Sequence, residues 1–172
     1  WDTATGREVI VYHGHTPANT EEDPKAGISG VPLKVPEAIF LPGGKLVASA
    51  GGKEIHIWDL KTGKLEKTLT GADRLVKSIA VSSDGKTLVG GSDDKIVRLW
   101  NLDSGKLTYT SQPQASRIEA VAYQPKGKYV AAVDADGYLA VYDPTGENKT
   151  PVFKIQITDG GDVLALGLIR HR

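Results

Sequence analysis

Two histidines near the start of the chain have the spacing of metal ligands. His13 and His15 flank Gly14, so an extended backbone would direct both imidazoles to the same side, and acidic residues follow at Glu21, Glu22 and Asp23. The simpler interpretation is that the pair binds no metal and that His13 is exposed on a strand end. We therefore expect no bound metal here.

A second acidic pattern, Asp134-Ala135-Asp136-Gly137, alternates carboxylates ahead of a glycine, as some calcium loops do. The downstream acidic ligand of such a loop is not evident in the sequence. The same four residues suit a tight hairpin turn, which is the interpretation we favour. Asp93, in the run Ser92-Asp93-Asp94, is expected to face solvent at a similar turn.

The composition argues against most other chemistry. The 172 residues include no cysteine, which excludes disulfides, thiolate ligands and a cysteine nucleophile. No nucleophile with its base, no catalytic carboxylate pair and no phosphate-binding glycine loop is evident. We therefore predict a protein without catalytic residues or cofactor.

Charge and hydropathy exclude two classes of partner. Lysine plus arginine and aspartate plus glutamate both number 21, and no block of like charge interrupts the chain, so neither a nucleic acid nor an anionic membrane surface is an expected partner. The longest apolar run, 163–169, is too short to cross a bilayer. No signal or transmembrane segment is visible, and the sequence sets no compartment.

The elements that would position these residues repeat along the chain. Trp58, Trp100 and Tyr142 are 42 residues apart, and each is followed by Asp or Asn and then by a turn containing glycine. The positions one and three residues before each aromatic are apolar, which predicts a strand with one face on a core. The positions between them, occupied by His56, Arg98 and Ala140, vary freely and are expected to meet a less demanding environment.

Each repeat contains four predicted strands. Residues 35–41, 76–82 and 118–124 are rich in Val, Ile and Ala, as strands covered on both faces are, and are expected to be innermost. Leu46, Leu88 and Val130, again 42 apart, begin their hairpin partners, the aromatic strands follow, and a more polar fourth strand suits an outer edge. No helical periodicity is long enough for a crossover, so the repeats are antiparallel meanders that must stack on one another.

These motifs resemble the WD-repeat β-propeller family. The aromatic-Asp dipeptides, Ser92-Asp93-Asp94 ahead of Trp100, and Gly14-His15 after Trp1-Asp2 carry the resemblance, which covers nearly the whole chain. It implies an all-β propeller of four-stranded antiparallel blades. The Gly-Lys turns look similar to those of bacterial members.

The resemblance also implies a hydrogen-bonded set inside each blade, built from a Gly-His, a Ser or Thr, a turn Asp and the Trp. The positions that match it, or hold the equivalent aromatic, are His15, Trp58, Ser92, Asp94, Trp100, Asp136 and Tyr142. No repeat has the full set, because Gly71-Ala72 and Pro113-Gln114 stand where Gly-His should recur, and Gly52 replaces the turn Asp of the first full repeat. These blades must therefore rely more on apolar packing.

The repeats predict the organisation of the chain. Residues 1–15 would end one blade, 35–71, 76–112 and 118–158 would form three whole blades, and 163–172 would begin another, giving about three and a half blades. Because an open arc leaves blade faces uncovered, we expect the remaining blades to come from the rest of a longer chain or from another chain. Residues 16–34 break the period as an inserted loop.

By resemblance, partners would dock on the face made by the loops leading into the inner strands and the tight turns after the second strands. The residues expected there are His13, Glu21, Glu22, Asp73, Arg74, Asp93, Ser116, Arg117 and Asp134. The predicted function is a non-catalytic protein–protein interaction scaffold that presents a rigid face. The alternative is an accessory propeller domain of a larger enzyme or redox protein.

Overall fold

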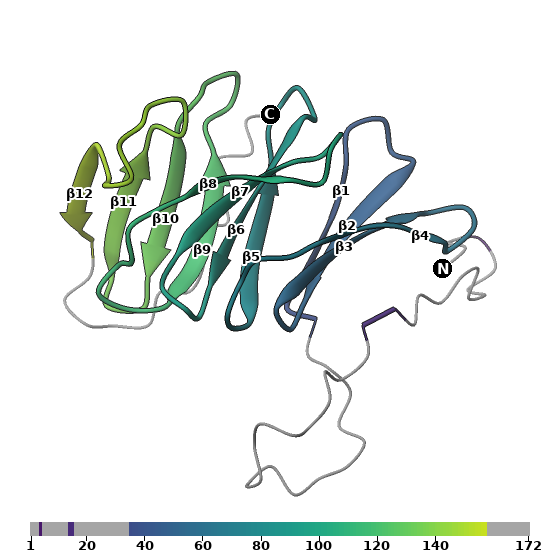
Figure 1. Ribbon diagram of the computed structural model, residues 1–172, viewed down its shortest axis with the longest axis horizontal. Coiled ribbons are helices and arrows are strands. Elements are labelled where there is room, and N and C mark those ends of the chain that lie inside the picture. The colour runs from purple at the N-terminus through teal and green to yellow at the C-terminus, as the bar shows by residue number, and fades with distance from the viewer. Residues whose placement is uncertain (1–3, 5–13, 16–34, 158–172) are drawn as a thin grey trace, which may run out of the picture.

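Residues 4, 14–15 and 35–157 are described by the computed structural model of the protein, and they contain twelve strands and no helix (Figure 1). None of the elements in this part of the chain could therefore be a membrane-spanning helix. The first sheet holds β1 (Glu37–Phe40), β2 (Leu46–Gly51), β3 (Glu54–Asp59) and β4 (Leu65–Leu69). The second holds β5 (Val76–Val81), β6 (Thr87–Ser92), β7 (Val97–Asn101) and β8 (Leu107–Thr110). The third holds β9 (Ile118–Tyr123), β10 (Val130–Asp134), β11 (Tyr138–Tyr142) and β12 (Phe153–Gln156).

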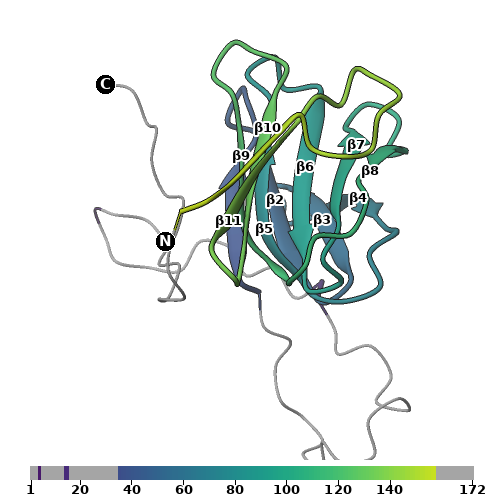
Figure 2. The same ribbon diagram turned by 90° about the vertical axis from the view of Figure 1, so that its left-hand side faces the viewer.

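Each sheet is an antiparallel meander whose strands pair in chain order. The strands are short and the turns between them are tight, with glycines at positive φ at Gly63 and Gly105 in the turns after the aromatic strands. The second sheet's inner strand, β5, contacts both β1 and β9, so the three sheets fan side by side with their first strands together (Figures 1 and 2). The all-β prediction and the inner-to-outer order of the strands are confirmed.

The core lies between the sheets. Ile55 and Ile57 of β3 are buried in one cluster with Leu88 and Trp100 of the second sheet. The opposite face of β7 supplies Val97 and Leu99 to a second cluster, which also contains Tyr142 of the third sheet. A strand's successive side chains point to opposite faces, so the middle sheet is covered on both.

This arrangement corrects one expectation. His56, Arg98 and Ala140, the freely varying positions of the aromatic strands, are buried rather than placed in a less demanding environment. These positions lie on the same face of the strand as the aromatic side chain, and this face packs against the preceding part of the chain. The apolar positions one and three residues before the aromatic residue lie on the other face, which packs against the following sheet. A sheet held between two neighbours has no solvent face, so the variable positions must be satisfied by specific partners.

The inner strands are also joined by polar contacts that follow the repeat. The Ile79 backbone N–H donates to Glu37 Oε2 at 2.6 Å, and the Val121 N–H donates to Ser78 Oγ at 3.1 Å. Lys77 of β5 forms an ion pair with Glu119 of β9. Each of these contacts joins one sheet to the next, so polar groups on the inner strands reinforce the apolar packing.

The pairing register revises the alignment of the repeats. Leu88 pairs with Trp100 and Val130 with Tyr142, but Val47, not Leu46, pairs with Trp58. Ala50 pairs with Ile55 where Gly91 pairs with Val97, so the first sheet's turn is one residue shorter. The 42-residue spacing therefore holds for the third and fourth strands of the first two sheets and becomes 41 for their first and second strands. The shorter turn also explains why Gly52 stands where the turn Asp was expected.

We predict a large loss of stability when the indole of Trp100 is removed. The side chain is buried between the first two sheets and its Nε1–H donates to the Thr70 carbonyl at 2.8 Å. Trp100→Ala should lower the free energy of unfolding by about 3–5 kcal/mol. Urea denaturation monitored by circular dichroism measures this.

Leu107→Ala is the control for this prediction, because Leu107 is exposed on an outer strand, and it should cost less than about 1 kcal/mol. Equal losses for the two variants would mean that burial between sheets does not dominate stability.

Candidate interaction surface

The loops before β5 and β9 and the turns after β6 and β10 meet at one end of the sheets. We call this the entry face and define it by the exposed residues Asp73, Arg74 and Arg117 and the half-buried Asp93 and Ser116. The Asp73 side chain is 86% exposed and that of Arg117 is 57% exposed. Charges of both signs are therefore accessible on this face.

The backbone beneath these side chains is fixed by hydrogen bonds between the two kinds of loop. The Asp93 N–H donates to the Leu75 carbonyl at 2.9 Å, and the Ala135 N–H donates to the Arg117 carbonyl at 2.9 Å. The Gln114 N–H reaches the Lys95 carbonyl at 2.8 Å. Each loop is thus tied to the turn of a sheet, and the entry face has little freedom to rearrange.

A buried arginine organises the entry face at the second sheet. Arg98 Nη1 lies 2.7 Å from Asp94 Oδ2, and its Nη2 lies 3.8 Å from Asp73 Oδ2. The same Asp94 carboxylate accepts the backbone N–H of Asp73 at 2.9 Å and that of Ile96 at 3.1 Å. Burying a charge is costly unless it is paired, so Asp94 and Arg98 hold the loop before β5 in one position.

Ser92 completes this second-sheet cluster. Its hydroxyl donates to the Arg74 carbonyl at 3.2 Å and accepts the Asp94 N–H at 3.2 Å. Trp100 lies on the same face of the sheet, but its indole donates to Thr70 and not to the serine. Of the residues that the family resemblance singled out in this repeat, Ser92 and Asp94 contact each other and Arg98 joins them, whereas Trp100 bonds to Thr70.

The first sheet carries a different cluster at the equivalent place. His15 Nε2 lies 2.8 Å from Ser49 Oγ, and the His15 ring stacks on His56 with 4.0 Å between ring centroids. Glu54 Oε2 accepts a hydrogen bond from His56 Nε2 at 3.0 Å. His56 occupies the position that Arg98 holds in the second sheet, so a histidine stack replaces an arginine ion pair. Trp58 is half-buried on the same face of β3.

In the third sheet the buried and the exposed acidic turn residues are the reverse of those expected from the sequence. Asp134 is fully buried, and its Oδ1 accepts the N–H groups of Asp136 and Tyr138 at 3.1 and 3.0 Å. Asp136 is exposed, whereas Tyr142 is fully buried between the second and third sheets. Asp134 therefore stabilises the turn from inside and, contrary to the expectation from the sequence, is not part of the accessible surface.

Two further charged residues, Lys77 and Glu119, form a chain with Arg117 across the inner strands near the entry face. Glu119 accepts from both Lys77 and Arg117, the latter at 2.6 Å from Nε. Burial raises the pKa of Glu119, but these hydrogen bonds and charges outweigh it and leave the pKa below its usual value. The carboxylate thus stays ionised and positions Arg117.

Sequence reasoning missed Ser49, Lys77 and Glu119. Ser49 is a second-strand serine that bonds His15, but its register equivalent in the second sheet is Gly90 and not Ser92, so the spacing of the repeats did not reveal it. Lys77 and Glu119 are exactly one period apart, so opposite charges at equivalent inner-strand positions were a usable signal.

His13, Glu21 and Glu22 lie outside the described residues. Within the described part of the chain, no three His, Asp or Glu side chains are grouped as a metal site.

We predict that the His15 and His56 stack makes stability depend on pH. Burial, and then the neighbouring His56, lower the pKa of His15 below its usual value of about 6.5. The neutral ring is favoured in the folded state, so its contribution is complete above about pH 6.5 and is lost as the pH falls through the lowered value. When the pH is lowered from 8 to 5.5, the denaturant concentration at the midpoint of unfolding should decrease. It should decrease less in His15→Gln than in the unchanged protein. Identical slopes in the two proteins would contradict a role for this pair.

Comparison with known proteins agrees with the repeats seen in the fold. Residues 63–101 and 105–143 each match the family described as "WD domain, G-beta repeat". Two solved structures, "Crystal structure of RRP9 WD40 repeats" and "Structure of U3-55K", each superpose with a TM-score of 0.67 at 20% identity. No curated protein matches the chain.

Each superposition covers 74% of this chain and 40% of the other, so the chain spans less than half the length of these structures. At this identity the likeness shows the fold. Residues 63–101 and 105–143 thus match WD repeats, and the three stacked four-stranded meanders have the fold of WD40 propellers.

Proposed function

We propose that the chain is a non-catalytic scaffold whose entry face binds a protein partner. WD40 propellers generally serve as protein-interaction scaffolds. The observation that carries the proposal is the combination of exposed charges with a fixed backbone: Asp73 and Arg117 project from loops that are hydrogen-bonded to neighbouring turns. A surface that is already ordered loses little conformational entropy on binding.

The partner would need charges of both signs. Asp73 and Arg74 are adjacent and oppositely charged. Arg117 lies on the loop before β9, and Asp93 lies in the turn after β6. Such an alternation favours a specific docking orientation more than it favours tight binding, because misaligned partners place like charges together. His13 and, in the inserted loop, Glu21 and Glu22 would extend this surface.

We also propose that a further blade, from the rest of the protein or from another chain, covers the outer face of the third sheet. Leu139 and Val141 occupy the positions of the buried Ile55 and Ile57 but are half-exposed. Beside them on β12, Phe153 is 51% and Ile155 47% exposed. Every equivalent face between described sheets is covered, which supports the same use here. A role in a larger enzyme or redox protein stays a prediction.

We expect a photo-crosslinking amino acid at the entry face to capture the partner. Placed at Arg74, it should yield a discrete adduct with a protein in an extract of the source cells, identified by mass spectrometry. The control carries the same amino acid at Lys106, in a turn at the other end of the strands, and should give no such adduct. Adducts of equal yield at both positions would refute a defined face.

The proposed cover of the third sheet predicts dye binding by the isolated chain. An apolar fluorescent dye should bind, and replacing Val141 and Ile155 together by Thr should reduce its fluorescence by at least half, because the dye's apolar surface is removed. The paired replacement of Val35 and Leu65, which are exposed on the first sheet's side, is the control. An unchanged signal in the Val141 and Ile155 variant would contradict the proposal.

A further inference from the structure

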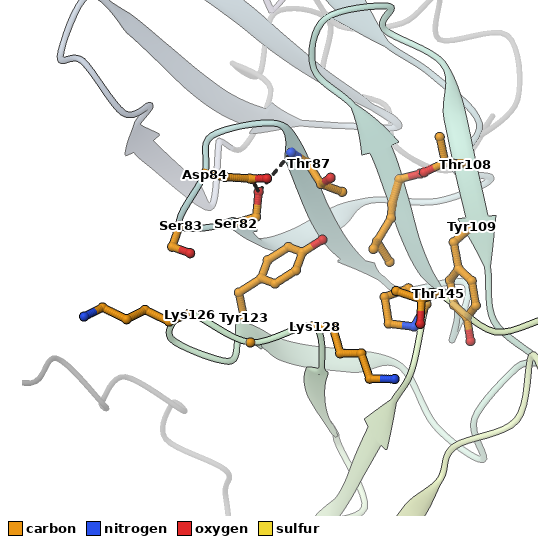
Figure 3. A pocket seen from close by; sticks show the side chains of 13 residues that line it. Ser82, Ser83, Asp84, Thr87, Thr108, Tyr109, Tyr123, Lys126, Lys128 and Thr145 are labelled. Atoms are coloured by element: carbon orange, nitrogen blue, oxygen red, sulfur yellow. Dashed lines mark hydrogen bonds between the residues drawn. The ribbon is translucent and has the colours of Figure 1, made fainter.

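The end of the sheets opposite the entry face holds two slots at equivalent places in the repeat. One lies between the first and second sheets and has a volume of about 270 Å³. The other lies between the second and third sheets and has a volume of about 450 Å³ (Figure 3). Both are lined by the turn after the inner strand, by the third and fourth strands of one sheet, and by the turns of the next. We call the larger one the polar slot.

The two slots differ in chemistry although the fold is the same. The smaller slot is lined by Leu46, where the polar slot has Thr87, and by Leu41, where the polar slot has Ser82. The fold therefore accepts apolar side chains at these two positions. A polar lining at the second interface gives up that packing, which indicates that it serves another purpose.

Lys67 closes the smaller slot. Its Nζ donates to the carbonyls of Leu102 and Asp103, each at 2.6 Å, and so links the first sheet to the second across the opening. Tyr109 holds the equivalent position in the polar slot, and its hydroxyl reaches the Asn148 carbonyl at 3.4 Å. No comparable bridge to the turn at Pro144 and Thr145 spans the polar slot in the described residues.

The interior of the polar slot combines aromatic rings with hydroxyl groups. Burial raises the pKa of both Tyr109 and Tyr123, the latter to about 12, so both phenols are neutral at physiological pH. In Figure 3 the Tyr123 ring lies across the slot with its hydroxyl towards Thr87. Hydroxyls donate and accept hydrogen bonds, and tyrosine rings offer contact area with little loss of side-chain entropy. Such groups can hydrogen-bond to a peptide backbone and pack against it.

Two lysines line the polar slot, and only one of them has an ion-pair partner among the described residues. Asp84 accepts from the Ser82 hydroxyl at 2.6 Å and from the Lys86 N–H at 3.0 Å, with the Lys86 charge close by. Lys128 forms an ion pair with Asp143 at 2.5 Å, which holds the Asp143 pKa at about 2. Lys126 makes no ion pair with any residue that the structure describes.

Lys126 is also held in an unusual backbone conformation. Its φ is 54°, a left-handed value that is unfavourable for a non-glycine residue, although Gly127 follows directly. The equivalent turn of the second sheet places the positive φ on Gly85 instead. A strained lysine beside an available glycine is a feature that stability alone does not favour.

We propose that the polar slot binds an extended acidic peptide of a protein partner, with a carboxylate at Lys126 and the peptide backbone on the slot's hydroxyl and phenol groups. This inference rests on the proposed scaffold function but concerns the opposite end of the sheets. The entry-face crosslink can therefore succeed while this site fails, and the reverse.

Fluorescence anisotropy with labelled pentapeptide pools tests the proposal. The first pool carries a fixed central Glu-Glu pair, the second pool carries Gln-Gln, and the third pool carries two phosphoserines. In each pool the other positions are randomised uncharged residues. The protein should bind the Glu pool at least tenfold more tightly than the Gln pool and no more weakly than the phosphoserine pool. Preference for phosphoserine by tenfold or more, or equal binding of Glu and Gln, would overturn the proposal.

Two variants locate the effect. Lys126→Gln should remove the preference for Glu, whereas Lys106→Gln, which alters a lysine in a turn outside the polar slot at the same end of the molecule, should keep it. Thr108→Glu places in the slot the side chain that Glu66 supplies in the smaller slot, so the fold is expected to accept it. It should weaken binding of the Glu pool at least tenfold. Equal losses in Lys126→Gln and Lys106→Gln would show charge attraction without a site.

Discussion

Burial of one sheet's apolar face against the next is the interaction on which this structure depends. A four-stranded meander with two apolar faces cannot shield both by itself, and here the second sheet is sandwiched so that Trp100 meets the first sheet and Leu99 the third. The stacking decides which positions need a partner. It explains why the strand positions that vary most between repeats, such as Arg98, are buried and bonded rather than free.

The variable positions give each interface its own chemistry. At the entry face, the first sheet uses the stack of His15 and His56 and the second uses the ion pair of Arg98 and Asp94. At the other end, Lys67 closes one slot whereas Tyr109 lines an open one. A repeat supplies the same frame several times, so differences between equivalent positions are the places where function can be added without altering the fold.

Rigidity and accessibility are separated in this molecule. The hydrogen bonds that fix the loops involve backbone groups and buried side chains such as Asp94 and Asp134, whereas the exposed Asp73 and Arg117 carry the charges that a partner would meet. The division has a physical basis. A buried carboxylate that accepts backbone N–H groups orders a turn, whereas an exposed carboxylate can exchange its contacts with water for contacts with a partner. The proposed scaffold role rests on this separation.

The sequence by itself determined the repeat, the four strands in each unit and their order, because period-two apolar patterns and glycine turns are local properties. It also located the turn residues, Asp94 and Asp134 among them. Only the tertiary structure decided that Val47 and not Leu46 pairs with Trp58, that Ser49 meets His15, and that Asp134 points inward. Those facts depend on strand register and on the neighbouring sheet, and a contact between residues distant in the chain leaves no signal in local spacing.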